Sequence, residues 1–161
     1  MAKAVYAGSF DPFTRGHLEV LAHASDLFDE VCIVIAQNPS KHRAFPADRM
    51  LIAIEKMLHN YHAVLPNCTV ALLPEGMAIV DFAKAIGAAF LVRGVRSVDD
   101  CAYELKMAEI NKQLDFTIQT IYIPTNNNTS STMVRNCKQF GRRWSVLVPT
   151  AIFEEFDDGQ D

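Results

Sequence analysis

The sequence predicts an α/β fold: a single Rossmann-like domain with a doubly wound, five-stranded parallel sheet. Short apolar runs alternate with longer helical patterns along the 161 residues. Continuous apolar runs are typical of strands buried on both faces, and parallel strands need crossover connections, usually helices. At this length we expect one domain over residues 1–161, with residues 157–161 forming a disordered acidic tail.

The alternation defines each expected element. Strands are predicted at Ala4–Ala7, Val31–Ala36, Thr69–Leu73, Phe90–Val92 and Thr120–Ile123. Helices are predicted at Gly16–Phe28, Pro46–Leu58, Ala78–Ile86, Val98–Leu114, Ser131–Phe140 and from about Pro149 to Phe156. Ligands of doubly wound sheets lie beyond the carboxyl ends of the strands. The polar segments that follow the strands are therefore expected to form one active site: 8–17, 37–41, 74–77, 93–98 and 124–132.

Composition narrows the class of protein. The formal net charge of −4 argues against a general nucleic-acid binder, so no nucleic-acid partner is expected. The four cysteines, Cys32, Cys68, Cys101 and Cys137, lack metal-site spacing and favour buried thiols over disulfides or zinc. A strand begins almost at the N-terminus and no apolar run would span a membrane, so we expect a cytoplasmic protein without membrane association.

The segment Gly8–His17 carries the strongest chemical signal. A strand, a glycine-bearing loop and a helix N-terminus form an anion site, because free backbone N–H groups and the helix dipole face the same point. The segment lacks the Walker and dinucleotide patterns. Ser9 is expected to cradle phosphate and His17 to donate to it, although a histidine can also simply begin a helix. Phe10 and Asp11 are expected to shape the loop, with Asp11 bonded inside its own turn.

Basic side chains follow the second predicted strand. Asn38–Arg43 would by default be a solvated loop, but its place at the ligand edge favours Lys41 as a contact to an anionic acceptor. His42 and Arg43 are expected to face solvent.

Two arginines follow the fourth predicted strand. Arg93 and Arg96 flank Gly94-Val95 and can aim two planar guanidinium groups at neighbouring phosphates. An ion pair with Asp99 or Asp100 is the alternative. Further along, Glu104 could be a surface carboxylate, and Tyr103 is expected in the core or at an interface.

A run of hydroxyls precedes the fifth long helical pattern. Ser130 is a natural helix N-cap, but capping explains only one hydroxyl of Thr129–Thr132. Hydroxyls and free amides there, with Arg135 behind them, are suited to a second anion site for a triphosphate.

Together these segments resemble the phosphopantetheine adenylyltransferases of the nucleotidyltransferase superfamily, over about residues 5–156. The shared motifs are G-S-F-D-P-F-T-R-G-H, N-P-S-K, D-F-A, R-G-V-R-S-V-D-D, Y-E-L-K-M-A-E-I-N, S-S-T-M-V-R and a late V-P. The chain departs from the family with Arg15 in place of the usual Asn, and with a short loop lacking an aromatic after Pro124.

The resemblance implies transfer of the adenylyl group of ATP to 4′-phosphopantetheine by direct in-line attack, with Mg²⁺, in a homohexamer. It implies His17, Lys41 and Arg96 as catalytic residues, with His17 stabilising the transition state. It places ATP at Ser9, Phe10, His17, Gly94, Val95, Arg96, Glu104, Asn126, Asn127, Asn128, Thr129, Ser130, Ser131 and Thr132. It places 4′-phosphopantetheine at Ser9, Lys41, Ile79 and Arg93.

Two alternatives stay open at this point. One is another nucleotidyltransferase of the superfamily, with a different nucleotide or phosphorylated acceptor. The other is a nucleotide-binding module without catalysis. Coenzyme A is a further candidate ligand, as a feedback regulator.

Overall fold

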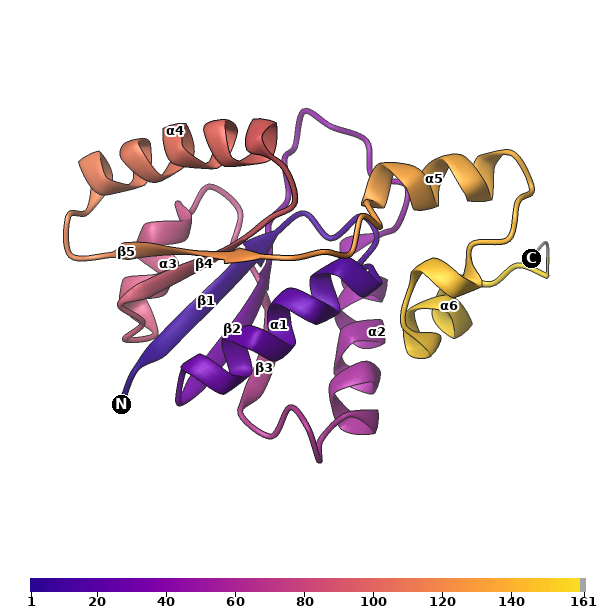
Figure 1. Ribbon diagram of the computed structural model, residues 1–161, viewed down its shortest axis with the longest axis horizontal. Coiled ribbons are helices and arrows are strands. Elements are labelled where there is room, and N and C mark those ends of the chain that lie inside the picture. Colours follow the sequence, from indigo (N-terminus) through magenta and orange to yellow (C-terminus); the bar gives the residue numbers. More distant parts are fainter. Residues whose placement is uncertain (160–161) are drawn as a thin grey trace.

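The computed structural model describes residues 1–159 and contains one five-stranded sheet with helices on both faces (Figure 1). The strands are β1 (Lys3–Gly8), β2 (Glu30–Ile35), β3 (Cys68–Leu72), β4 (Phe90–Val95) and β5 (Gln119–Pro124). The helices are α1 (Arg15–Leu27), α2 (Ala47–Asn60), α3 (Ile79–Ala85), α4 (Val98–Leu114), α5 (Ser131–Gln139), the short 3₁₀ helix η1 (Ser145–Leu147) and α6 (Thr150–Phe156).

The strand order is β3-β2-β1-β4-β5, and every pairing is parallel. The chain winds outward from β1 through β2 and β3, then returns to the other side of β1 with β4. The winding therefore reverses between β1 and β4, the point at which doubly wound sheets bind ligands. The predicted α/β fold class is confirmed.

Most predicted elements begin and end within two residues of their observed bounds, but β4 does not. It extends to Val95 because Arg93, Gly94 and Val95 pair with Tyr122, Ile123 and Pro124 of β5. The prediction that Arg93 lies in a loop was therefore wrong. Pairing with β5 is a long-range contact, which the composition of Arg93–Val95 does not reveal.

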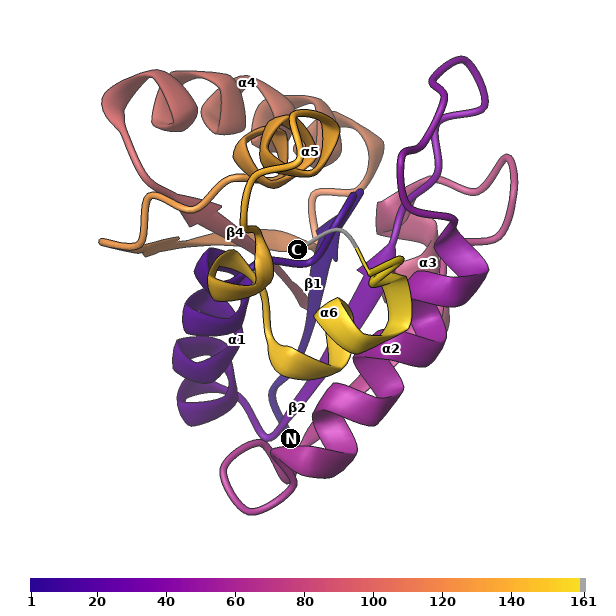
Figure 2. The same ribbon diagram turned by 90° about the vertical axis from the view of Figure 1, so that its right-hand side faces the viewer.

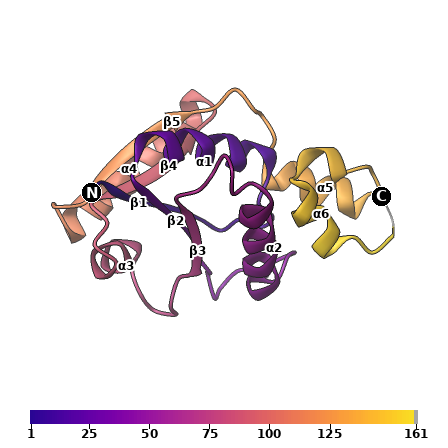
Figure 3. The same ribbon diagram turned by 90° about the horizontal axis from the view of Figure 1, so that it is seen from below.

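The two faces of β1 contribute to two apolar clusters. Ala4 and Tyr6 belong to the larger cluster, which includes residues of α1, α2 and α6, whereas Val5 and Ala7 face the cluster that includes α3. This alternation follows the two-residue repeat of a strand. Figure 3 shows α1 and α3 on opposite sides of the sheet.

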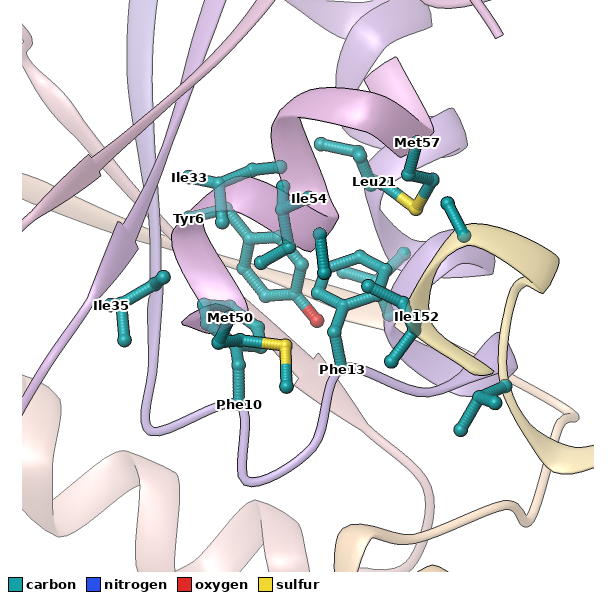
Figure 4. Close-up of a cluster of buried hydrophobic side chains, with 14 of the residues drawn as sticks. Tyr6, Phe10, Phe13, Leu21, Ile33, Ile35, Met50, Ile54, Met57 and Ile152 are labelled. Atoms are coloured by element: carbon teal, nitrogen blue, oxygen red, sulfur yellow. The ribbon is translucent and has the colours of Figure 1, made fainter. Parts of the chain in front are cut away.

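The loop after β1 is part of the larger cluster. Phe10 and Phe13 are 1% and 0% exposed, and Figure 4 shows both rings pointing into the core among Met50, Ile54 and Ile152. The segment between β1 and α1 is thus anchored by buried aromatic rings. Figure 2 shows α5 and α6, the last two α-helices of the chain, on the side that faces the viewer.

The cysteines and the C-terminal segment were also subjects of prediction. Within residues 1–159 the four cysteines are free, and no helix is long and apolar enough to cross a membrane. The proposed acidic tail lies partly outside the described residues, at 160–161. In the described part, Asp158 pairs with Lys138 at 2.9 Å.

Candidate active site

A cavity of about 210 Å³ opens at the carboxyl ends of β1 and β4. Eight residues predicted for the site contribute to its lining, namely Ser9, Phe10, His17, Arg93, Gly94, Arg96, Glu104 and Thr129. Its other lining residues are Tyr6, Ala7, Gly8, Gly16, Val20, Asp100 and Thr125. The convergence expected from the strand order is therefore present.

A second hollow, of about 490 Å³, adjoins the first at Ser9, which lines both. Its basic side chains include Lys41, Arg43 and Arg135. Lys41 thus lies in the hollow next to the His17 cavity, not in the cavity itself. The two hollows provide neighbouring places for two anionic groups, separated by Ser9.

Ile79 lies in neither hollow. It begins α3 and packs against the cluster of apolar residues on that face of the sheet. A third pocket, of about 300 Å³, is lined instead by Lys41 and the segment Leu73–Met77. Met77, 39% exposed, is an apolar lining residue of this pocket and belongs to the predicted site segment 74–77.

The orientation of His17 is fixed by the beginning of α1. Thr14 is the N-cap: its hydroxyl accepts from the backbone N–H of His17, and its own N–H donates to Nδ1 of His17 at 2.9 Å. A backbone N–H can only donate, so Nδ1 is the acceptor nitrogen and the ring proton resides on Nε2. The capping box thereby selects a tautomer that offers one N–H donor.

The protonation state of His17 follows from its surroundings. Phe10 lies edge-on to its ring at 5.0 Å between centroids, and Phe13 lies at 5.4 Å. Burial, together with the charges of Arg96 and Arg93, lowers the pKa of His17 to about 3. His17 is therefore neutral at physiological pH and acts as a hydrogen-bond donor through Nε2.

Phe10 adopts an uncommon backbone conformation beside this ring. Its φ is 43°, in the left-handed region that residues with a Cβ rarely occupy. Its buried ring and the hydrogen bonds around it maintain this conformation. The resulting turn places Ser9 at the junction of the two hollows.

Both arginines of the R-G-V-R segment pair with carboxylates of α4. Arg93 donates Nε and Nη2 to Glu104 at 2.6 and 2.7 Å, and Nη1 to the carbonyl of Ala7. Arg96 donates Nε to Asp100 at 3.0 Å. The ion-pair alternative thus holds for Arg96 with Asp100, whereas Arg93 pairs with neither Asp99 nor Asp100.

These ion pairs leave donors for a ligand. Of the five N–H groups of Arg93, the three bonds to Glu104 and Ala7 leave two. Arg96 bonds to Asp100 through Nε, so the two terminal amino groups of Arg96 remain available to donate. Both arginines can therefore still donate to phosphate oxygens.

The N-terminus of α5 uses its hydroxyls mainly for structure. Ser130 caps the helix as predicted, accepting from the N–H of Met133. The hydroxyl of Ser131 donates to the carbonyl of Pro12 at 2.8 Å, and that of Thr132 accepts from Arg135. The four hydroxyls thus do not all face a phosphate, and Thr129 is the member of the run that lines the cavity.

The loop before α5 is folded against α1. The N–H of Asn126 donates to Glu19, and the side-chain oxygen of Asn127 accepts from the N–H of Thr129. Asn126 and Asn128 are exposed. The three asparagines lie outside the lining of the cavity, so their predicted contact with ATP stays a prediction.

Gly16 lines the cavity and is a packing residue that the sequence analysis did not single out. A Cβ at this position would lie 2.9 Å from the carbonyl oxygen of Thr129. Only glycine lets the loop before α5 approach α1 this closely. The Gly16-His17 pair at the start of α1 was the sequence feature that could have indicated this close packing.

Three expectations about individual side chains were wrong. Asp11 does not bond within its own turn: it accepts from the N–H groups of Ala44 and Phe45. The Arg43 side chain is not simply directed into solvent, because it donates to the carbonyls of Phe10 and Phe45. The Glu104 side chain is only 12% exposed and is not a surface carboxylate. Tyr103 is 61% exposed, so it is not in the core, and its place at an interface stays a prediction. The partners of Asp11 and Glu104 lie in other segments of the chain, so local sequence could not predict these contacts.

Comparison with known proteins agrees with this geometry. The cytidylyltransferase-like family model matches residues 5–137. A phosphopantetheine adenylyltransferase from Clostridium novyi is 36% identical over 158 residues, covering 96% of this chain and 94% of that protein. One from Alkaliphilus metalliredigens is 32% identical, covering 96% of both chains. The chain belongs to the phosphopantetheine adenylyltransferase family.

A solved structure supports the fold independently. The nicotinic acid mononucleotide adenylyltransferase of Plasmodium falciparum aligns with a TM-score of 0.70 at 14% identity. The alignment covers 96% of this chain and 93% of that one. At this identity, the likeness extends to the fold alone.

The lowered pKa of His17 predicts a loss of stability in acid. Between about pH 6.5 and pH 3 the unfolded chain protonates His17 while the folded chain does not, so the free energy of unfolding falls as pH falls. Because the ring keeps some contact with solvent, we expect the wild type to lose roughly 1 to 2 kcal/mol more than His17→Asn between pH 7 and pH 5. Urea unfolding at both pH values measures this difference, and an equal loss in the two proteins would contradict the assignment.

Proposed function

We propose that this chain transfers the adenylyl group of ATP to 4′-phosphopantetheine, producing dephospho-coenzyme A and pyrophosphate. The observation that carries the proposal is the pair of adjoining hollows that share Ser9, one containing His17 and Arg96 and the other Lys41. The named relatives supply the substrates, since both relatives described above are phosphopantetheine adenylyltransferases.

In the proposed reaction, a phosphate oxygen of 4′-phosphopantetheine attacks the α-phosphorus of ATP. The new P–O bond forms as the bond between the α-phosphorus and its bridging oxygen to the β-phosphate breaks, and pyrophosphate leaves with that electron pair. The acceptor phosphate is already an anion, so neither a protein nucleophile nor a general base is required. Catalysis then depends on positioning and on stabilisation of charge.

The site residues would divide these tasks. His17, neutral and protonated on Nε2, would donate to an oxygen of the reacting phosphate. Arg96 would stabilise the triphosphate through its two terminal amino groups. Lys41, from the adjoining hollow, would neutralise the acceptor phosphate, and the two remaining N–H groups of Arg93 would hold it.

The family resemblance implies magnesium as a companion of the triphosphate. Residues 1–159 contain no cluster of three or more His, Cys, Asp or Glu able to hold a metal ion. The carboxylates that line the cavity, Asp100 and Glu104, are in ion pairs with arginines. A magnesium ion would therefore be carried by the triphosphate and would neutralise its charge.

We also propose a cytoplasmic location. Self-association through α4 is a further part of the proposal. None of the residues 98–114 of α4 is buried, and the apolar side chains of Tyr103, Ile110 and Leu114 are 49–63% exposed at helical spacing. An apolar stripe of this kind marks an interface. We propose that α4 packs against other copies of the chain and that the assembly is a homohexamer, with coenzyme A as a candidate feedback ligand.

Pyrophosphate release tests the function directly. We expect release with Mg-ATP and 4′-phosphopantetheine together, and none when either is omitted. Reactions with CTP and GTP in place of ATP serve as controls. Release with a different nucleotide would indicate another nucleotidyltransferase activity, and ATP binding without release would favour a nucleotide-binding module.

Removal of the His17 donor should affect turnover more than binding. We expect His17→Ala to lower kcat by about 10²–10³-fold, as other lost transition-state donors do, with little change in the KM for ATP. His23→Ala, an exposed histidine on the same helix, is the matched control. Near-normal turnover of His17→Ala would exclude His17 as a transition-state stabiliser.

A charge placed on the α4 stripe should disrupt the assembly. We expect Ile110→Glu to yield smaller species, because burying an unpaired carboxylate in an apolar interface is costly. Ile52→Glu provides a control, since Ile52 is an isoleucine of α2 with a similar exposed fraction of 45%. Light scattering after gel filtration measures the mass, and an unchanged mass for Ile110→Glu would place the interface elsewhere.

A further inference from the structure

Three successive carbonyls in the loop after β1 accept hydrogen bonds from distant side chains. The carbonyl of Phe10 accepts from Arg43 at 3.1 Å, that of Asp11 from Arg135 at 2.7 Å, and that of Pro12 from Ser131 at 2.8 Å. The donors come from the segment before α2 and from α5. The loop is thus bonded on one side to the segment that carries Lys41 and on the other to the helix that follows the Thr129 loop.

The side chain of Asp11 adds a second connection to the Lys41 segment. Its Oδ1 accepts from the N–H of Phe45 at 2.7 Å, and its Oδ2 accepts from the N–H of Ala44 at 3.2 Å. Asp11 is only 9% exposed, and Arg135 lies 4.0 Å from its carboxylate. Hydrogen bonds to an ionised acceptor are stronger than those between neutral groups.

The Lys41 segment contains a local turn, in which the backbone N–H groups of Ser40 and Lys41 both donate to Asn38 at 3.0 Å. Residues 37–42, between β2 and Arg43, are exposed, and the side chain of Lys41 donates to no group of the described residues. Phe45 anchors the far end of the segment, since its buried ring packs edge-on to Trp144 and Phe156. The contacts of Asp11 at residues 44 and 45 therefore connect the end of this segment to the loop that contains Ser9.

Asp11 is one of the residues that line the acceptor hollow. We propose that it is a positioning residue for the acceptor substrate, and that its carboxylate acts through Lys41. Its carboxylate fixes the end of the Lys41 segment, while its own backbone lies directly after the phosphate loop. The distance between the acceptor hollow and the His17 cavity is thereby set by one residue. This inference rests on the proposed function, which assigns the acceptor phosphate to Lys41.

Asp11→Asn is the variant that tests the carboxylate with the least change in shape. Asparagine has one oxygen, so it keeps one acceptor and places an NH₂ group against the second backbone N–H. We expect the Kd and KM for 4′-phosphopantetheine to rise roughly tenfold, the equivalent of one charge-assisted hydrogen bond. The KM for ATP should stay within about twofold, because the bonds from Arg135 and Ser131 go to backbone carbonyls that the substitution retains.

A second variant and a control separate positioning from general destabilisation. Arg43→Gln removes the bonds to Phe10 and Phe45 and also a cation of the acceptor hollow, so it should lower acceptor affinity at least as much as Asp11→Asn. Asp29→Asn removes another carboxylate that accepts a backbone N–H, from Ala2 at 2.6 Å in an exposed turn, and should leave both KM values unchanged.

Calorimetry with 4′-phosphopantetheine and with ATP, each alone, makes the outcomes distinguishable. Unchanged acceptor affinity in Asp11→Asn, or an equal loss of affinity for both ligands, would overturn the positioning role. Wild-type protein that binds 4′-phosphopantetheine but releases no pyrophosphate with Mg-ATP would overturn the proposed reaction and leave the binding comparison valid. Wild-type protein that binds no 4′-phosphopantetheine would overturn both.

Discussion

The reciprocal hydrogen bonding of Thr14 and His17 is the constraint on which the site depends. It satisfies free N–H groups at the start of α1, orients the imidazole and leaves the proton on Nε2. Thr14 is fully buried and also lies within hydrogen-bond distance of the carbonyl of Thr129, so the same residue holds the loop before α5 against α1. Helix capping, tautomer selection and docking of that loop are thus one set of contacts.

Packing of the apolar core also fixes the surroundings of His17. Phe10 and Phe13 extend from the phosphate loop into the core, and their rings surround His17. The packing that stabilises the fold therefore also removes water from the imidazole and lowers its pKa. A neutral donor is the form suited to a reaction in which the nucleophile needs no deprotonation.

The sequence predicted what depends on local pattern. Apolar runs located every strand, and the glycine-bearing loop before α1 located the cavity that Ser9 and His17 line. Long-range contacts were not predictable: β4 continues through Arg93–Val95 only because β5 pairs with it, and Asp11 bonds to a segment more than thirty residues away. Arg43 was placed in solvent because its neighbours in the chain are polar, whereas its partners belong to the core and to the first loop.

The arrangement of charge explains how an acidic chain can bind polyanions. The net charge is −4, yet the guanidinium groups of Arg93 and Arg96 line the cavity, each held through Nε by a carboxylate of α4. Glu104 and Asp100 limit the side-chain freedom of the arginines while leaving N–H groups directed elsewhere. An arriving phosphate then meets oriented donors, and less conformational entropy is lost when they bind. Each acidic residue near the cavity thus lowers the local positive charge but makes the donors that remain more effective.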